Sequence, residues 1–133
     1  KDLAILRDGT RVDVSLGQGV EGETVRDIGR ETSREYAQII MQSKTIVSSG
    51  PMGVFEDKEF ELGSRTVLEA MAEKGAFTVV GGGHMASYAS MLGLDGRLSH
   101  VSTAGGAMLT FLAGEDLPGV KALIESARRQ TAR

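Results

Sequence analysis

Hydrophobic and polar residues follow two different periods along this chain. Short β-branched or apolar runs occur at 45–48, 77–80 and 100–102, and glycine-rich segments follow them. Between the runs, small and apolar residues mixed with polar ones predict helices over 64–74 and 84–92. Strands and helices that alternate in this way favour a parallel β-sheet.

The first 25 residues have a different pattern. Two β-like runs, 3–7 and 11–14, flank the pair Asp8-Gly9. This pair favours a tight hairpin turn, because glycine tolerates a positive φ. The segment 15–25 is polar and rich in glycine, which is typical of a loop. We therefore expect a β-hairpin and loop over 1–25 and β/α units over 26–133.

Three further helices are expected. In the segment 27–44, Thr32 and Glu35 have the spacing of a capping box, and apolar residues follow at helical spacing. A short helix precedes Gly114. Pro118 suits the first position of a last helix, whose apolar residues recur on one face at Val120, Leu123, Ile124 and Ala127.

The expected fold class is therefore α/β, a partial domain with a three-layer αβα, Rossmann-like parallel sheet and an N-terminal β-hairpin. Short apolar strands between helices imply a parallel sheet that is covered on both faces. Ligands of such sheets bind at the carboxyl ends of the strands. Three glycine-rich loops follow the strands, SSGPMG, GGGHM and STAGGA, so we expect a ligand site where they converge.

Composition narrows the class of function. The formal net charge of the 133 residues is −3, so charge gives no reason to expect a nucleic acid or an anionic membrane as partner. The absence of cysteine excludes disulfides and fits a reducing cytosol, although it also suits other compartments. No apolar run approaches the roughly 20 residues of a membrane span. Lys1 and not methionine comes first, so we expect a piece of a longer protein.

The triplet Gly81, Gly82 and Gly83 stands where a strand leads into a helix. Free amides at a helix N-terminus attract anions, and glycine leaves no Cβ in the way of a phosphate. The alternative is a tight turn that needs a positive φ and binds nothing. His84 lies on the same loop, but no second ligand stands at metal spacing, so no metal site within the protein is expected.

The same loop also fits a relaxed dinucleotide fingerprint, Gly81-x-Gly83-x-x-Ala86. A nicotinamide cofactor would need an acidic residue about 20 positions later to hold its ribose. That region has the sequence SHVSTAGG and contains no acid. The dinucleotide-binding module of an oxidoreductase is therefore the weaker alternative.

The segment GPMGVFE contains a second candidate site. Pro51 fixes φ, and Gly50 and Gly53 allow a tight fold around it. Glu56 could accept hydrogen bonds from a sugar hydroxyl. The alternative, which composition alone favours, is a turn followed by a solvated acidic run at Asp57, Glu59 and Glu61.

Four segments, in this order, resemble the carboxyl-terminal part of phosphoglycerate kinase. They are a DIG turn, helix and strand at 26–47, GPMGVFE at 50–56, TVVGGGH at 78–84, and HVSTAGGAMLTFLAGEDLPGVKAL at 100–123. The resemblance spans roughly residues 26–127. The histidine after the glycine triplet and the compact length resemble an archaeal-type member.

The resemblance implies that this part of the nucleotide-binding domain cradles ADP or ATP. Gly81, Gly82 and Gly83 match the catalytic loop beside the transferring phosphoryl group. Glu56 matches the acid that contacts the ribose. His84 stands where many members have an aspartate near the metal, so Mg²⁺ would be held mainly through the nucleotide phosphates. The expected nucleotide-binding residues are Gly50, Pro51, Gly53, Glu56, Gly81, Gly82, Gly83 and His84.

The family transfers a phosphoryl group between 1,3-bisphosphoglycerate and ADP in glycolysis and gluconeogenesis, in the cytoplasm. The resemblance covers about the last third of such an enzyme. The amino-terminal domain, which would bind 3-phosphoglycerate or 1,3-bisphosphoglycerate, has no counterpart here, so we expect this chain alone to be inactive. A sheet that lacks the rest of its domain exposes an edge strand and an apolar face, so we also expect the fragment to self-associate.

Overall fold

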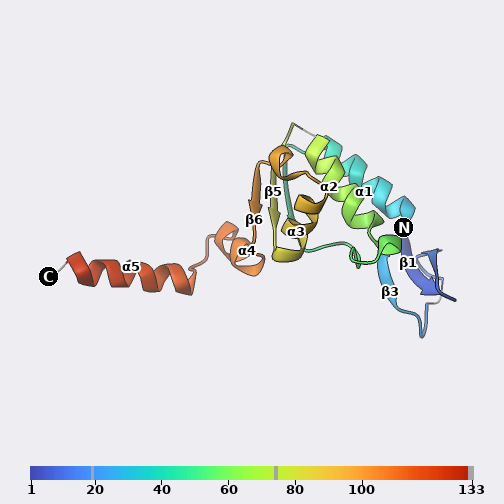
Figure 1. Ribbon diagram of the computed structural model, residues 1–133, viewed down its shortest axis with the longest axis horizontal. Helices are drawn as coiled ribbons and strands as arrows, with labels where there is room; N and C mark the ends of the chain where they lie inside the picture. The colour runs from blue at the N-terminus through green and yellow to red at the C-terminus, as the bar shows by residue number, and fades with distance from the viewer. Residues whose placement is uncertain (19, 74, 132–133) are drawn as a thin grey trace.

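Two three-stranded sheets organise the chain, as the computed structural model in Figure 1 shows. The structure describes residues 1–18, 20–73 and 75–131. The predicted segments also included residues 19, 74, 132 and 133, which lie outside this part. The second sheet, with its helices, confirms the α/β class.

The first sheet is antiparallel, with the strand order β2-β1-β3. It consists of β1 (Asp2–Arg7), β2 (Thr10–Ser15) and β3 (Val25–Ile28). Asp8 and Gly9 form the turn of the predicted hairpin, with φ angles of 51° and 75°. The third strand was not predicted, and residues 26–28 had been assigned to the β/α units. This strand has only four residues and no alternating pattern, and only its pairing with β1 identifies it.

The second sheet is parallel, in the order β4-β5-β6. Its strands β4 (Thr45–Ser49), β5 (Phe77–Gly81) and β6 (His100–Ser102) lie where the apolar runs predicted them. The expected helices are also present: α1 (Arg30–Gln42), α2 (Leu62–Glu73), α3 (Gly83–Met91), α4 (Gly106–Leu112) and α5 (Pro118–Thr131). The described residues also form two 3₁₀ helices, η1 (Lys58–Phe60) and η2 (Asp95–Arg97).

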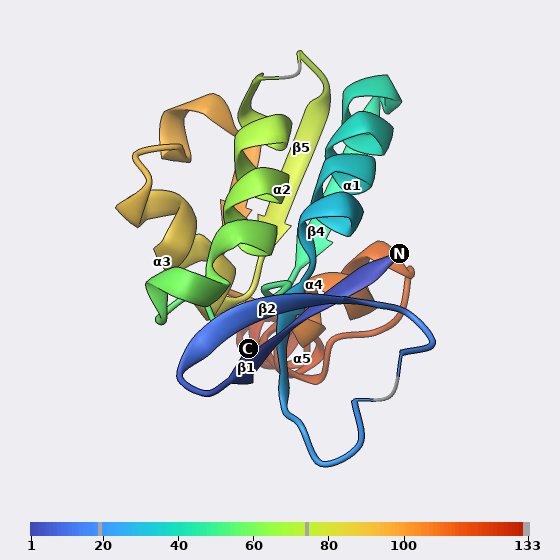
Figure 2. The ribbon, with the colours of Figure 1, turned by 90° about the vertical axis from the view of Figure 1, so that its right-hand side faces the viewer.

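The core lies between one face of the parallel sheet and helices α1, α2 and α3. Figure 2 shows α1 and α2 side by side in front of β4 and β5. Val80 of β5 and the half-buried Ile46 and Val101 contribute to this core. On the opposite face, Val47 and Phe77 remain 44% and 57% exposed. Apolar side chains of the sheet are therefore accessible on that face.

Helix α1 is capped by a residue far away in the sequence. The carboxylate of Asp2 accepts hydrogen bonds from the amides of Glu31 (3.0 Å) and Thr32 (2.7 Å). A Cβ on Gly29 would collide with this carboxylate. Burial disfavours ionisation of Asp2, but these hydrogen bonds outweigh burial and lower its pKa. The predicted capping box is therefore wrong, because Thr32 lies inside the helix, the N-cap residue is Gly29, and the Asp2 carboxylate accepts the capping hydrogen bonds.

A second aspartate joins the antiparallel sheet to helix α2. The Asp27 side chain is fully buried, and it accepts hydrogen bonds from Arg11 Nη1 (3.0 Å) and from the Gly63 amide at the start of α2 (2.9 Å). The Arg11 guanidinium also donates to the carbonyl of Glu59 (2.7 Å). A Cβ on Gly53 or Gly63 would collide with Asp27. This carboxylate thus connects the antiparallel sheet to the turn around Gly53 and to α2.

Helix α5 extends away from the rest of the chain (Figure 1). Its predicted start at Pro118 is confirmed, but none of its described residues is buried, and Leu123 is 72% exposed. Among the described residues, no helix is long and apolar enough to cross a membrane.

Replacement of Asp27 by alanine tests the importance of this buried carboxylate. Asp27→Ala leaves the buried Gly63 amide without its acceptor and removes one of the two carboxylate partners of Arg11, which keeps its ion pair with Asp13 (3.0 Å between Nε and Oδ1). We therefore expect the free energy of unfolding to fall by about 1–3 kcal/mol. Glu35→Ala removes an exposed ion pair with Lys1, with 3.7 Å between Lys1 Nζ and Glu35 Oε2, and should cost less than about 1 kcal/mol. Urea denaturation measures the free energy of unfolding of both variants. Equal losses would contradict the structural importance assigned to the buried Asp27 carboxylate.

Candidate active site at the glycine-rich edge

Three glycine-rich segments meet at the carboxyl edge of the parallel sheet. A Cβ on Gly82 would lie 3.8 Å from the Cα of Gly105 and 3.9 Å from the amide nitrogen of Gly50. The loops after β4, β5 and β6 are therefore in direct contact, as the sequence predicted. Their mutual approach leaves little room for side chains at the centre of this edge.

The first two glycines of the triplet are required by the fold itself. A Cβ on Gly81 would collide with the side chain of Met108 in α4. Gly82 has a φ of 94°, and its amide donates to the carbonyls of Ser102 and Ala104, both at 3.1 Å. The Gly82 amide is therefore engaged within the protein. Packing and backbone conformation explain glycine at these two positions without a ligand.

The third glycine has a different environment. Gly83 is exposed and begins α3, and a Cβ there would have no heavy atom within 4 Å. The first hydrogen bond of the helix runs from the Ala86 amide to the Gly82 carbonyl (2.9 Å). The amides of Gly83, His84 and Met85 precede it, and in an α-helix such amides have no partner within the helix. Of the triplet, only Gly83 is therefore open to a ligand, together with the next residue, His84; both residues are exposed.

The turn at 50–56 is anchored through its backbone. The buried hydroxyl of Ser64, in the first turn of α2, accepts a hydrogen bond from the Met52 amide (2.9 Å). The Val54 amide donates to the carbonyl of Arg26 (2.9 Å). Pro51 and Glu56 are exposed, so the turn presents both of them to solvent.

Phe55 packs this turn against α3. Its ring stacks on Tyr88 with 4.6 Å between centroids, and it meets the His84 ring edge-on at 6.3 Å. These ring contacts place the turn that carries Glu56 next to α3. The two candidate sites of the sequence are thereby brought together, through Phe55 and Tyr88, which the sequence analysis missed. The spacing of four residues between His84 and Tyr88 signalled that one helix face presents both.

Glu61 also differs from its prediction. It was assigned to a solvated acidic run, but it is half-buried and accepts a hydrogen bond from the Tyr88 hydroxyl (2.8 Å). Burial together with this bond raises the pKa of Tyr88 to about 12. Burial disfavours the charge on Glu61, but hydrogen bonds from Tyr88 and Arg65 outweigh burial and lower its pKa. At neutral pH, Tyr88 is therefore a neutral donor to an ionised carboxylate.

Across residues 1–18, 20–73 and 75–131, no group of three His, Cys, Asp or Glu side chains could hold a metal ion. The histidine at the glycine loop offers nitrogen, whereas Mg²⁺ prefers oxygen ligands. A magnesium ion at this edge would thus depend on oxygens that a ligand supplies.

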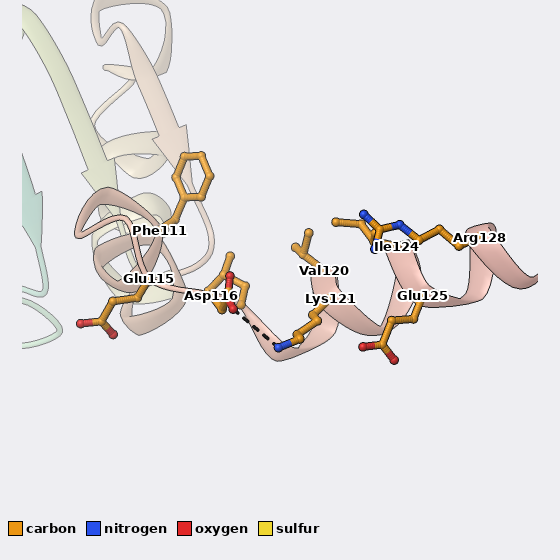
Figure 3. Close-up of a pocket in the computed structure, with 9 residues that line it drawn as sticks. Phe111, Glu115, Asp116, Val120, Lys121, Ile124, Glu125 and Arg128 are labelled. Atoms are coloured by element: carbon orange, nitrogen blue, oxygen red, sulfur yellow. Dashed lines mark ion pairs between the residues drawn. The ribbon is translucent and has the colours of Figure 1, made fainter.

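Two hollows lie away from the glycine triplet. One of about 370 Å³ lies along α5, where Phe111, Val120 and Ile124 point to the same side (Figure 3). The other, of about 440 Å³, lies between α1 and β4 and reaches Met52 of the 50–56 turn. The first hollow is separated in the fold from the glycine-rich edge, so we do not assign it to the candidate site.

Comparison with known proteins agrees with this arrangement of loops. Residues 4–115 match the family model described as phosphoglycerate kinase. The chain belongs to the phosphoglycerate kinase family. All three glycine-rich segments of this edge lie within residues 4–115, the part of the chain that matches the family model.

Relatives and solved structures extend the match. The chain is 41% identical to phosphoglycerate kinase of Methanothermus fervidus, over 96% of this chain and 31% of the relative. It is 52% identical to that of Pyrococcus abyssi, over 92% of this chain and 30% of the relative. The crystal structure of phosphoglycerate kinase from Pyrococcus horikoshii superimposes with a TM-score of 0.82 at 41% identity, covering 96% of this chain and 32% of that structure. The chain thus spans about a third of the length of these phosphoglycerate kinases.

Replacement of Gly83 tests whether the start of α3 receives a phosphate. Gly83→Val should leave the fold intact, since the added Cβ meets no neighbour, yet it should cover the open amides. We expect ADP affinity to fall by roughly tenfold or more, the effect of losing hydrogen bonds to a charged group. Isothermal titration calorimetry measures the loss.

Gly96→Val provides the matched control. Gly96 also has space for a Cβ and lies in η2, away from the three loops. It should leave ADP affinity unchanged. Gly82→Val is unsuitable, because the φ of 94° would strain any other residue. An equal affinity of the Gly83→Val variant and the unmodified chain would exclude a phosphate at this helix.

Proposed function

We propose that this chain is the carboxyl-terminal portion of the nucleotide-binding domain of an archaeal-type phosphoglycerate kinase, and that it binds ADP or ATP. One observation supports this most directly. The open backbone at Gly83 and His84 lies next to the turn that carries the exposed Glu56, and Phe55 links the two. A helix start beside a carboxylate suits a ligand with both phosphates and a ribose.

Each residue has a distinct proposed role. The amides of Gly83 and His84 hold phosphate oxygens, and Glu56 accepts a hydrogen bond from a ribose hydroxyl. Gly81 and Gly82 contribute by allowing β5 and α4 to approach closely enough to shape the loop. Mg²⁺ is held mainly through the nucleotide phosphates. The wall of the nucleotide site is formed by Gly50, Pro51 and Gly53.

In the whole enzyme, this site would serve phosphoryl transfer between 1,3-bisphosphoglycerate and ADP. Such a reaction depends on positioning and on stabilisation of spread negative charge more than on covalent work by the protein. Fixed amides at a helix start provide that stabilisation without reorganising. We place the phosphoglycerate site in a part of the enzyme outside this chain, and the enzyme in the cytoplasm.

Self-association of the chain belongs to the same proposal. β4 has a neighbouring strand on only one side among the described residues. Together with the exposed Val47 and Phe77, this edge supports contact between copies. Light scattering at rising concentration measures it.

Calorimetry with three ligands tests nucleotide binding. ADP and ATP should release or absorb heat with this chain, whereas NAD should not. Glu56→Ala should weaken ADP binding by about 1–2 kcal/mol, since it removes a charge-assisted hydrogen bond. Glu21→Ala, at an exposed position in the loop before β3, is the control and should leave affinity unchanged. Heat with NAD and none with ADP would instead favour the dinucleotide-binding oxidoreductase.

Catalysis by the chain alone is a separate matter. We expect no turnover of 1,3-bisphosphoglycerate and ADP by these 133 residues, because they span about a third of the related enzymes, and we place the domain that would bind the acyl phosphate and close over the nucleotide outside them. A coupled assay that detects ATP should give the buffer rate, with a full-length phosphoglycerate kinase as positive control. A rate above buffer that scales with the concentration of this chain would refute the expectation.

A further inference from the structure

We propose that Tyr88, held by Glu61, is a positioning residue that fixes Phe55 and thereby sets Glu56 against the start of α3. This inference rests on the proposed function, in which Glu56 contacts the ribose. It concerns contacts beneath the binding surface, where neither Tyr88 nor Glu61 would touch the nucleotide.

Phe55 is the side-chain anchor of the turn. Between Gly50 and Glu59 it is the only buried residue, with 8% of its surface exposed. On the other side of Glu56, Asp57 is held by contacts of its own: its amide donates to the Val54 carbonyl (3.0 Å), its carbonyl accepts from the Phe60 amide (2.8 Å), and its carboxylate pairs with Arg26 (3.5 Å). None of these contacts involves α3. The Phe55 ring is the contact that joins this segment to α3, so the place of Glu56 relative to α3 depends on how firmly that ring is held.

Tyr88 provides the surface against which Phe55 rests. The two rings are nearly parallel, at 28° with 4.6 Å between centroids, and Tyr88 is only 2% exposed. Stacked aromatic rings prefer a particular relative orientation, whereas buried aliphatic side chains do not. One helical turn earlier, His84 meets the edge of the same Phe55 ring. Helix α3 thus supports Phe55 while its first residues present the open amides.

Glu61 prevents the Tyr88 ring from shifting. One carboxylate oxygen, Oε2, accepts from the Tyr88 hydroxyl (2.8 Å), and the other, Oε1, accepts from Arg65 Nη2 (2.7 Å) and Nε (3.1 Å). Glu61 directly precedes α2, and its carbonyl accepts from the Arg65 amide (2.8 Å). The chain of contacts therefore runs from α2 through α3 to the turn.

Substitutions at Tyr88 test this role. Tyr88→Leu removes the stacked ring and should weaken ADP binding by roughly tenfold, whereas Tyr88→Phe keeps the ring and should weaken it by roughly threefold or less. Leu98→Ala removes a buried core side chain at the other end of the sheet and serves as the stability-matched control. It should leave ADP affinity unchanged under conditions where all variants are folded. Should Tyr88→Leu not fold, Tyr88→Phe and Glu61→Ala take its place.

A double-mutant cycle with Glu56→Ala separates positioning from general destabilisation. If Tyr88 acts through Glu56, its substitution should have no further effect on ADP affinity once Glu56 is absent. The proposal would be overturned if the Tyr88 substitution weakened ADP binding equally with and without Glu56. It would also be overturned if the substitution had no effect in the chain that retains Glu56.

Hydrogen exchange gives a measurement that is independent of nucleotide binding. In the absence of ADP, the amides of Phe55, Glu56 and Asp57 should exchange faster in the Tyr88 variants and at the unmodified rate in Leu98→Ala. Unchanged exchange in the Tyr88 variants would refute the positioning role. If exchange rises but the unmodified chain does not bind ADP, the proposed function fails while the positioning role stands.

Discussion

The buried carboxylate of Asp27 is the constraint on which the rest of this structure depends. A buried charge is costly unless it is paired and hydrogen-bonded. Arg11 of β2 and the Gly63 amide of α2 meet this requirement from two different parts of the fold. The antiparallel sheet, the 50–56 turn and α2 must therefore keep their mutual arrangement for the charge to remain satisfied.

This constraint also explains residues that resemble a ligand site. Gly53 belongs to the turn proposed to border the nucleotide, yet a side chain there would collide with Asp27. Its glycine is thus required by the carboxylate behind the turn. The glycine triplet shows a similar division, because Gly81 faces Met108, Gly82 needs a positive φ, and only Gly83 faces open space. The three neighbouring glycines therefore have different roles: Gly81 allows packing, Gly82 allows the backbone conformation, and Gly83 leaves room for a ligand.

The first turn of α2 links the structural and functional parts. Within four residues, Glu61 holds Tyr88, the Gly63 amide holds Asp27, and Ser64 holds the backbone of the turn. A rigid helix start that contacts all three is well placed to keep a binding surface in shape. This arrangement is consistent with the general rule that binding groups on loops are positioned by a rigid scaffold.

Elements with local signals could be predicted from the residues alone. The hairpin at Asp8-Gly9, the strands near Val47, Val79 and Val101 and the amphipathic α5 followed from turn chemistry and periodicity within a few residues. The glycine-rich loops indicated a common edge, because parallel strands bring their carboxyl ends together.

The long-range partners, in contrast, became known only from the folded chain. Asp2 caps a helix that begins 28 residues later, at Arg30, and Glu61 meets Tyr88 across 27 positions. The short β3 became a strand only through β1, and the Gly82 amide turned inward because carbonyls of the next loop lie beside it. Hydrogen bonds and packing at such separations depend on where the chain returns in space, which no local pattern of residue types encodes.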